Sequence, residues 1–295
     1  MLLENFERHD VTVDGVHIAA WVAGSGSPVL ALHGYPQTHA MWHAVAPALA
    51  EDHTVVLTDL RGYGASDKPA GGKDHAGYAK RAMAADQVGV MAELGFDRFA
   101  LVGHDRGARV GHRLALDHPD RVSALAVIDI APTHHMVATT DLAMARAYFH
   151  WFFLSQQPPL PERLIGADPE LWLTCQLRAG HAGGVEFHPE AMAAYLEAFS
   201  RPETITASCE DYRAAVTIDF ETDVADRDRR VTCPLLVLWG DQGFIGLRYD
   251  PLAVWRDYAD DVRGQGLPAG HFVPEEAPGP VIAALRAFLP KKDTV

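Results

Sequence analysis

Short apolar runs alternate with stretches of helical periodicity along residues 27–130, and this alternation limits the fold more than any other feature of the sequence. The apolar runs fall at 27–34, 53–58, 98–105 and 121–130, with helical spacing between them at 40–50, 75–94 and 106–118. Such a pattern predicts a parallel sheet whose strands are joined by right-handed crossovers. Two further alternating runs, which meet at Asp14 and Gly15, predict a hairpin ahead of this sheet.

The alternation stops after residue 132 and resumes at 229. The stretch between is helix-like, aromatic and polar, and it contains the Pro-rich break QQPPLPERL. We therefore predict an α/β core formed by residues 1–132 and 229–295, with a mostly parallel eight-stranded sheet flanked by helices. A helical cap, residues 133–228, is inserted after the sixth strand, and the cleft between cap and core is the expected site.

The composition limits the partners. A formal net charge of −14 argues against nucleic acids and anionic membranes, because both bind basic surfaces. The three cysteines lack paired close spacing, so neither a disulfide framework nor a zinc site is expected, and we predict no metal and no cofactor. The polar N-terminus and the lack of a long apolar run predict a cytoplasmic protein.

The stretch GHDRG, residues 103–107, has the outline of a nucleophile elbow in which aspartate replaces the usual serine. It follows an apolar run and precedes a helical stretch, which is the context that an elbow needs. The loop HGYP, residues 33–36, follows an earlier apolar run, and its backbone N–H groups can contribute to an oxyanion hole. We assign this oxyanion hole to the backbone N–H of Tyr35 in the loop and that of Arg106 in the elbow. His271 lies between the last expected strand and the last helix. Two strand-end acids, Asp129 and Asp241, are candidates for the third member of the triad.

An aspartate nucleophile indicates a particular chemistry. A carboxylate with a pKa near ~4 is already ionised at neutral pH, so Asp105 can displace a leaving group from saturated carbon and become an ester. Water then hydrolyses that ester with His271 as the base, and a carboxylate behind the histidine fixes its tautomer.

Two arginines follow the nucleophile directly. Arg106 and Arg109 share one face of the expected helix, and their charges oppose the helix dipole, which favours anions at that end. They can form a bidentate clamp for a substrate carboxylate, or they can pair with acidic groups of the cap. Arg113, one turn further, is expected to pair with Asp117.

The chain resembles the α/β-hydrolase superfamily, and within it the haloacetate (fluoroacetate) dehalogenases. The resemblance covers nearly the whole chain, through HGYPQ, DLRGYGASDKP, GHDRGARVGHRLALDHP, DIAPT, HWFF, DYRA, LWG, YDPLAVWR and GHFVPEEAP. It implies an α/β-hydrolase core, hydrolysis of short 2-haloacids, Asp129 rather than Asp241 as the triad acid, and a homodimer. It also implies that Arg106 and Arg109 bind the substrate carboxylate. Residues 155–205 depart from the family pattern, which leaves the preferred halogen open.

The same resemblance assigns three cap residues, His150, Trp151 and Tyr212, to the departing halide. Each carries an N–H or O–H to donate. Without the resemblance, aromatic residues at helical spacing would be assigned to the core, as we assign Phe149, Phe152 and Phe153.

Two other functions remain open. An epoxide hydrolase uses the same Asp–His chemistry and holds the epoxide oxygen with two cap tyrosines, for which Tyr148, Tyr195 and Tyr212 are available. Arg106 argues against this function, because relatives that act on neutral substrates usually carry tryptophan after the nucleophile. A ligand-binding or receptor protein on the same fold is the third possibility. The presence of both Asp105 and His271 argues against it.

Overall fold

The computed structural model describes residues 2–180 and 186–291. Within these ranges eight strands form one sheet in the order β1-β2-β4-β3-β5-β6-β7-β8, in which β1, β2 and β4 pair antiparallel and all other neighbours pair parallel. The strands are β1 (Glu7–Val13), β2 (Val16–Gly24), β3 (Ser27–Leu32), β4 (His53–Thr58), β5 (Phe99–His104), β6 (Val122–Ile128), β7 (Leu235–Gly240) and β8 (Val262–Leu267). The predicted mostly parallel eight-stranded sheet is confirmed.

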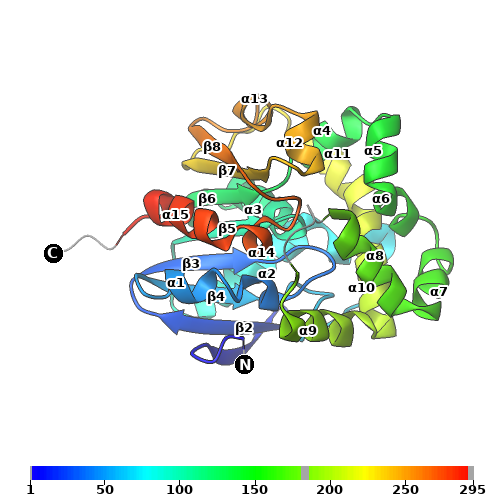
Figure 1. The fold of residues 1–295 in the computed structure, drawn as a ribbon, viewed down its shortest axis with the longest axis horizontal. Helices are drawn as coiled ribbons and strands as arrows, with labels where there is room; N and C mark the ends of the chain where they lie inside the picture. Colours follow the sequence, from blue (N-terminus) through cyan, green and yellow to red (C-terminus); the bar gives the residue numbers. More distant parts are fainter. Residues whose placement is uncertain (1, 181–185, 292–295) are drawn as a thin grey trace.

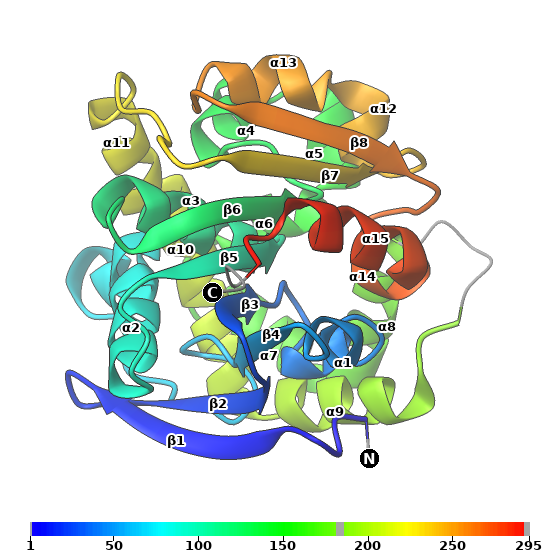
Figure 2. The same cartoon turned by 90° about the vertical axis from the view of Figure 1, so that its left-hand side faces the viewer.

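Helices cover both faces of this sheet, which explains why its central strands are apolar throughout rather than alternating. Every residue of β5 is buried. Figure 2 shows α2 (Lys80–Glu93) and α3 (Arg106–Asp117) on one side of the sheet, with α1 (Ala46–Leu49) and α15 (Pro278–Phe288) on the other. The short helices α12 (Phe244–Arg248), α13 (Pro251–Arg256) and α14 (Val273–Glu276) complete the C-terminal part.

The elements described between β6 and β7 are all helices, at the position where the sequence predicts an insertion. We call them the inserted helices: α4 (Thr133–Ala138), α5 (Leu142–Ala147), α6 (Phe149–Leu154), α7 (Leu160–Ala167), α8 (Pro169–Gly180), α9 (Pro189–Phe199), α10 (Pro202–Val216) and α11 (Ile218–Ala225). Figure 1 shows them gathered on one side of the molecule, beyond the ends of the central strands. The carboxyl ends of the parallel strands therefore face the inserted helices.

Two predicted elements differ in the structure. The helix expected over 40–50 is divided into a 3₁₀ turn, η1 (His39–Trp42), and the short α1. Proline lacks a backbone N–H and is tolerated in the first turn of a helix, so a new helix begins around Pro47 instead of the first one continuing. The helix expected over 75–94 begins only at Lys80, because Ala79 has an extended ψ of 144° and separates it from the preceding 3₁₀ turn, η2 (Lys73–Tyr78), in which Asp74 and His75 adopt positive φ angles.

None of the helices in the described ranges combines the length and apolar character needed to cross a membrane. The same ranges hold no group of three or more His, Cys, Asp or Glu side chains placed to bind a metal ion.

Candidate active site

Asp105 lies in the sharp turn between β5 and α3, with φ 45° and ψ −114°. This backbone conformation is strained for a residue with a side chain. The two flanking glycines make it possible, because a Cβ at Gly103 would lie 2.6 Å from the backbone of Ala108, and one at Gly107 would lie 2.5 Å from the carbonyl oxygen of His33. The GHDRG stretch therefore forms the expected elbow, and it presents the Asp105 carboxylate at the carboxyl edge of the sheet.

The carboxylate of Asp105 is almost fully buried and remains ionised. The backbone N–H of Tyr35 donates to its Oδ2 at 3.0 Å, and Arg106 is the first residue of α3, where backbone N–H groups lack partners within the helix. Burial raises the pKa of Asp105, but the charges of His271, His104 and the two arginines outweigh burial and hold this pKa below its ordinary value. The Asp105 carboxylate is thus charged at neutral pH.

His271 and Asp129 meet behind Asp105. Nδ1 of His271 lies 2.6 Å from Oδ2 of Asp129, and the other carboxylate oxygen accepts the N–H of Gly240 at 3.0 Å. Asp241, the rival acid, has an exposed side chain at the end of β7. The structure thus places Asp129, rather than Asp241, against the histidine.

A cavity of about 360 Å³ lies between the sheet and the inserted helices, and the Asp105 carboxylate is part of its wall. His271 and Phe272 line it from the core, and Tyr148 and His150 line it from the inserted helices. Three polar lining residues escaped the sequence analysis, namely Arg146, Gln176 and Gln242. The four-residue spacing between Arg146 and His150 is a signal that could have pointed to the arginine.

The two arginines are both buried, and they have different partners. Arg106 pairs with Asp211 of α10: its Nε donates to Oδ2 at 2.9 Å, and its Nη2 donates to Oδ1 and, at 2.8 Å, to the backbone carbonyl. Arg109 uses neutral acceptors, because its Nη1 donates to the carbonyl of Ala131 at 3.0 Å and to the hydroxyl of Thr133 at 3.1 Å. The pairing of Arg106 with an acidic group of the inserted helices is one of the two roles considered above. Nη1 of Arg106 and Nε of Arg109 are buried and have no hydrogen-bond partner among the described residues.

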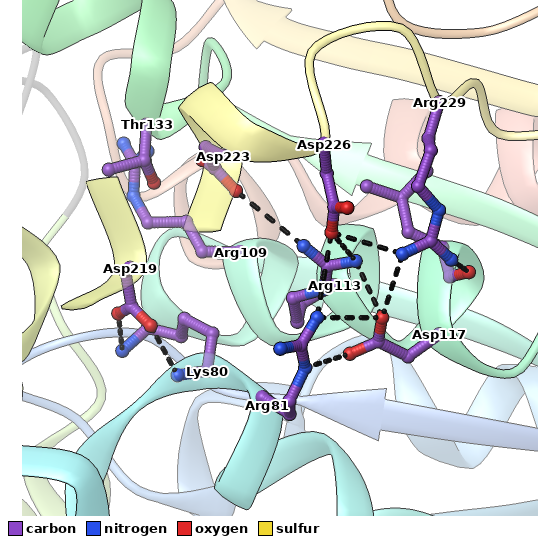
Figure 3. A network of polar contacts seen from close by, with 11 residues as sticks. Lys80, Arg81, Arg109, Arg113, Asp117, Thr133, Asp219, Asp223, Asp226 and Arg229 are labelled. Carbon is purple, nitrogen blue, oxygen red and sulfur yellow. Dashed lines mark hydrogen bonds and ion pairs between the residues drawn. The ribbon is translucent and has the colours of Figure 1, made fainter. Parts of the chain in front are cut away.

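A separate ionic network ties α3 to α11, and Figure 3 shows it. The expected contact of Arg113 with Asp117 is present at 2.6 Å, and Arg113 also pairs with Asp226 at 2.8 Å. Arg109 lies beside this network but points to Thr133. Arg113 therefore serves the packing of the inserted helices on the core.

The three residues assigned to the halide lie together. Tyr212 is the centre of the group, with its ring centroid 5.7 Å from that of His150 and 6.1 Å from that of Trp151. Two of these aromatic rings also stack against the arginines. Cζ of Arg106 lies 4.3 Å from the ring centroid of Tyr212, and Cζ of Arg109 lies 4.6 Å from that of Trp151. Burial lowers the pKa of His150 to about 3, so its imidazole is neutral and offers one N–H.

Four buried donors around this group have no hydrogen-bond partner among the described residues. They are Arg106 Nη1, Arg109 Nε, Trp151 Nε1 and the Tyr212 hydroxyl. A buried donor without a partner costs about 1–3 kcal/mol, and native structures keep few of them. Tyr195, by contrast, is satisfied, because its hydroxyl donates to Glu275 at 3.0 Å.

Comparisons with known proteins agree with this fold. A family model for the alpha/beta hydrolase fold matches residues 27–278. The chain is 49% identical over 289 residues to a fluoroacetate dehalogenase from Burkholderia sp., covering 98% of this chain and 95% of that protein. It is 35% identical to a soluble epoxide hydrolase from Corynebacterium sp. (strain C12), covering 96% and 97% of the two chains. A solved structure from Nostoc sp. PCC 7120 superposes with a TM-score of 0.95 at 55% identity, covering 98% and 99%.

Proposed function

The chain belongs to the α/β-hydrolase family, and we propose that it hydrolyses short 2-haloacids such as haloacetate to glycolate and halide through an ester on Asp105. Its action on carbon–halide bonds follows from its identity with the Burkholderia fluoroacetate dehalogenase along nearly the whole of both chains. The observation that carries the choice of substrate is the group of four unpartnered buried donors. A haloacid offers a carboxylate for the two arginines and a departing halide for Trp151 and Tyr212.

The first step joins an Asp105 oxygen to the carbon that bears the halogen, while the carbon–halogen bond breaks and its electron pair leaves with the halide. His150, Trp151 and Tyr212 donate hydrogen bonds to that halide. Each hydrogen bond to a charged acceptor contributes roughly 1.5–3 kcal/mol. Three that strengthen fully in the transition state would amount to about 5–9 kcal/mol, or about four to six decades in rate.

In the second step His271 takes a proton from water, and the resulting hydroxide attacks the ester carbonyl of Asp105. The backbone N–H groups of Tyr35 and Arg106 stabilise the oxyanion of the tetrahedral intermediate. The intermediate then expels the glycolate oxygen, which takes the proton from His271. Asp105 is left as a carboxylic acid, which releases the second proton of the water to solvent and returns to a carboxylate. Asp129 holds the imidazole in the tautomer that leaves Nε2 free to accept.

Epoxide hydrolysis is the second candidate. The 35% identity to the Corynebacterium enzyme favours it, and Tyr148 and Tyr212 could hold an epoxide oxygen. A neutral epoxide, however, brings no anion for the free nitrogens of Arg106 and Arg109. The haloacid therefore satisfies more of the buried donors.

The deciding experiment measures halide release from fluoro-, chloro- and bromoacetate alongside hydrolysis of styrene oxide by the same preparation. We expect halide from at least chloro- and bromoacetate, and little diol. Asp105→Asn is the control and should abolish both activities. Diol formation without halide release would replace the proposal with the epoxide hydrolase.

A further inference from the structure

Asp211 of α10 is a fully buried carboxylate at which three donors from the core converge. It accepts from Arg106, from Lys80 Nζ, and from the Tyr63 hydroxyl at 2.7 Å. Lys80 is itself buried at the start of α2 and is held by Asp219 of α11, which accepts its backbone N–H at 2.8 Å. Two buried cations from the core thus share one aspartate of the inserted helices.

This arrangement fixes the guanidinium of Arg106 in two ways. Nε and Nη2 both bind Asp211, which sets the rotation of the guanidinium within its plane. The ring of Tyr212 lies 4.3 Å from its central carbon, which sets the orientation of the plane itself. Nη1 is the nitrogen left without a partner among the residues that the structure describes, and it is buried. The side chain can therefore present that nitrogen without losing rotamer freedom when a ligand binds.

Lys80 makes this geometry compatible with binding an anion. Asp211 alone would neutralise Arg106, and a neutral pair attracts a carboxylate weakly. Because Lys80 contacts the same carboxylate, Asp211 is shared between two cations and does not belong to Arg106 alone. Asp219 accepts the backbone N–H of the lysine, and its Oδ2 lies 3.7 Å from Lys80 Nζ, so it offsets part of the lysine's charge from a longer distance than Asp211 does.

We infer that Asp211 and Lys80 are positioning residues for substrate recognition: they hold Arg106 with Nη1 as its one nitrogen free to bind the substrate carboxylate. The inference rests on the proposed function, in which Arg106 and Arg109 bind that carboxylate. The preference for an acid over a neutral analogue then depends on a contact between α10 and the core, and not on the two arginines alone.

The test compares kcat/KM for chloroacetate and chloroacetamide in wild type, Asp211→Asn and Lys80→Met. We expect Asp211→Asn to lower kcat/KM for chloroacetate about 30-fold, mainly through KM, and to change the value for chloroacetamide less than about threefold. Lys80→Met should lower the acid-to-amide ratio about tenfold. The matched control is Asp226→Asn, which removes another ion pair between α3 and the region after α11, at Arg113, without touching Arg106. It should leave the ratio unchanged.

Calorimetric binding of glycolate to the same proteins separates this inference from the proposed function. Weaker glycolate binding in Asp211→Asn supports the inference, even if the wild type releases no halide and the proposed function fails. A wild type that releases halide, with an unchanged acid-to-amide ratio in both variants, overturns the inference and leaves the function intact. A wild type that neither releases halide nor binds glycolate overturns both. If Asp211→Asn does not fold, the test uses the acid-to-amide ratio of kcat/KM in Lys80→Met instead, and an unchanged ratio in that variant overturns the inference.

Discussion

His271 lies between two carboxylates, and this position predicts how each step depends on pH. Burial lowers the pKa of His271, but the hydrogen bond and charge of Asp129, and then the charge of Asp105, outweigh burial and raise this pKa above 6.5. Only the neutral imidazole accepts a proton, so ester hydrolysis should slow as pH falls through that pKa. In the proposed mechanism the attack by Asp105 needs no base, and the lowered pKa of Asp105 keeps its carboxylate ionised.

Rapid quenching with bromoacetate should therefore show a first burst of halide that is nearly constant between about pH 6 and pH 8. The steady-state rate should fall about tenfold per unit below the pKa of His271. His271→Ala should keep the burst, lose the steady state and accumulate an ester on Asp105, visible by mass spectrometry. A burst that declines together with the steady state would assign His271 to the first step instead.

Some site residues could be predicted from the sequence, whereas some of their contacts could not. The candidate nucleophile Asp105 and the candidate base His271 follow from local motifs, because each lies in a turn whose residues are close in sequence. The partner of Arg106 does not, since Asp211 is 105 residues away and only the docking of α10 brings the two together. Helical spacing showed that Arg106 and Arg109 share a face, but it could not show that one has a charged partner and the other neutral ones.

At the scale of elements, α9, α14 and the loop before η1 meet at a buried acid that the sequence did not reveal. Glu275 of α14 binds the hydroxyl of Tyr195 on α9 and the amide of Gln37. Burial raises the pKa of this carboxyl from 4.5 to about 8. A raised pKa means that the folded state holds the proton more tightly, so the stability from this group is complete below 4.5 and is lost as pH rises towards 8.

Glu275→Gln should remove this loss, because its amide stays neutral. Its stability relative to the wild type should increase from pH 5 to pH 8, by at most about 1.4 kcal/mol per pH unit. Urea unfolding of both proteins at several pH values measures the difference, and Glu93→Gln, at an exposed glutamate, is the control. A difference that stays constant with pH would show that Glu275 is ionised throughout.

The elements themselves follow the sequence most closely where one physical signal dominates. The hairpin turns at Asp14 and Gly15, with φ angles of 48° and 80°, because these residue types accept a left-handed conformation. The four apolar runs between residues 27 and 130 form the strands β3, β4, β5 and β6 of the sheet, whose two faces are covered by helices. The stretch 40–50 is helical in two pieces rather than one, because apolar spacing continues through Pro47 whereas the helical hydrogen bonding does not.

At the scale of the whole molecule, a net charge of −14 repels an anionic substrate at long range. Among the described residues, the wall of the cavity contains one arginine and no lysine. This arginine is Arg146 of α5, and it is exposed. We expect Arg146→Gln to lower kcat/KM for chloroacetate a few-fold at low salt. The effect should vanish as the screening length shrinks from about 30 Å at 0.01 M to about 3 Å at 1 M salt. Turnover of chloroacetamide is the control and should not respond, while a salt-independent loss would place Arg146 in direct contact with substrate.

The ion pair between Arg106 and Asp211 also bears on recombination between related enzymes. Its arginine comes from the segment before the inserted helices and its aspartate from within them. A chimera that took its inserted helices from a relative without the aspartate would leave the buried guanidinium of Arg106 without its partner. Crossover points between residues 80, 106 and 211 should therefore yield active progeny only where the two parents carry the same residues at these three positions.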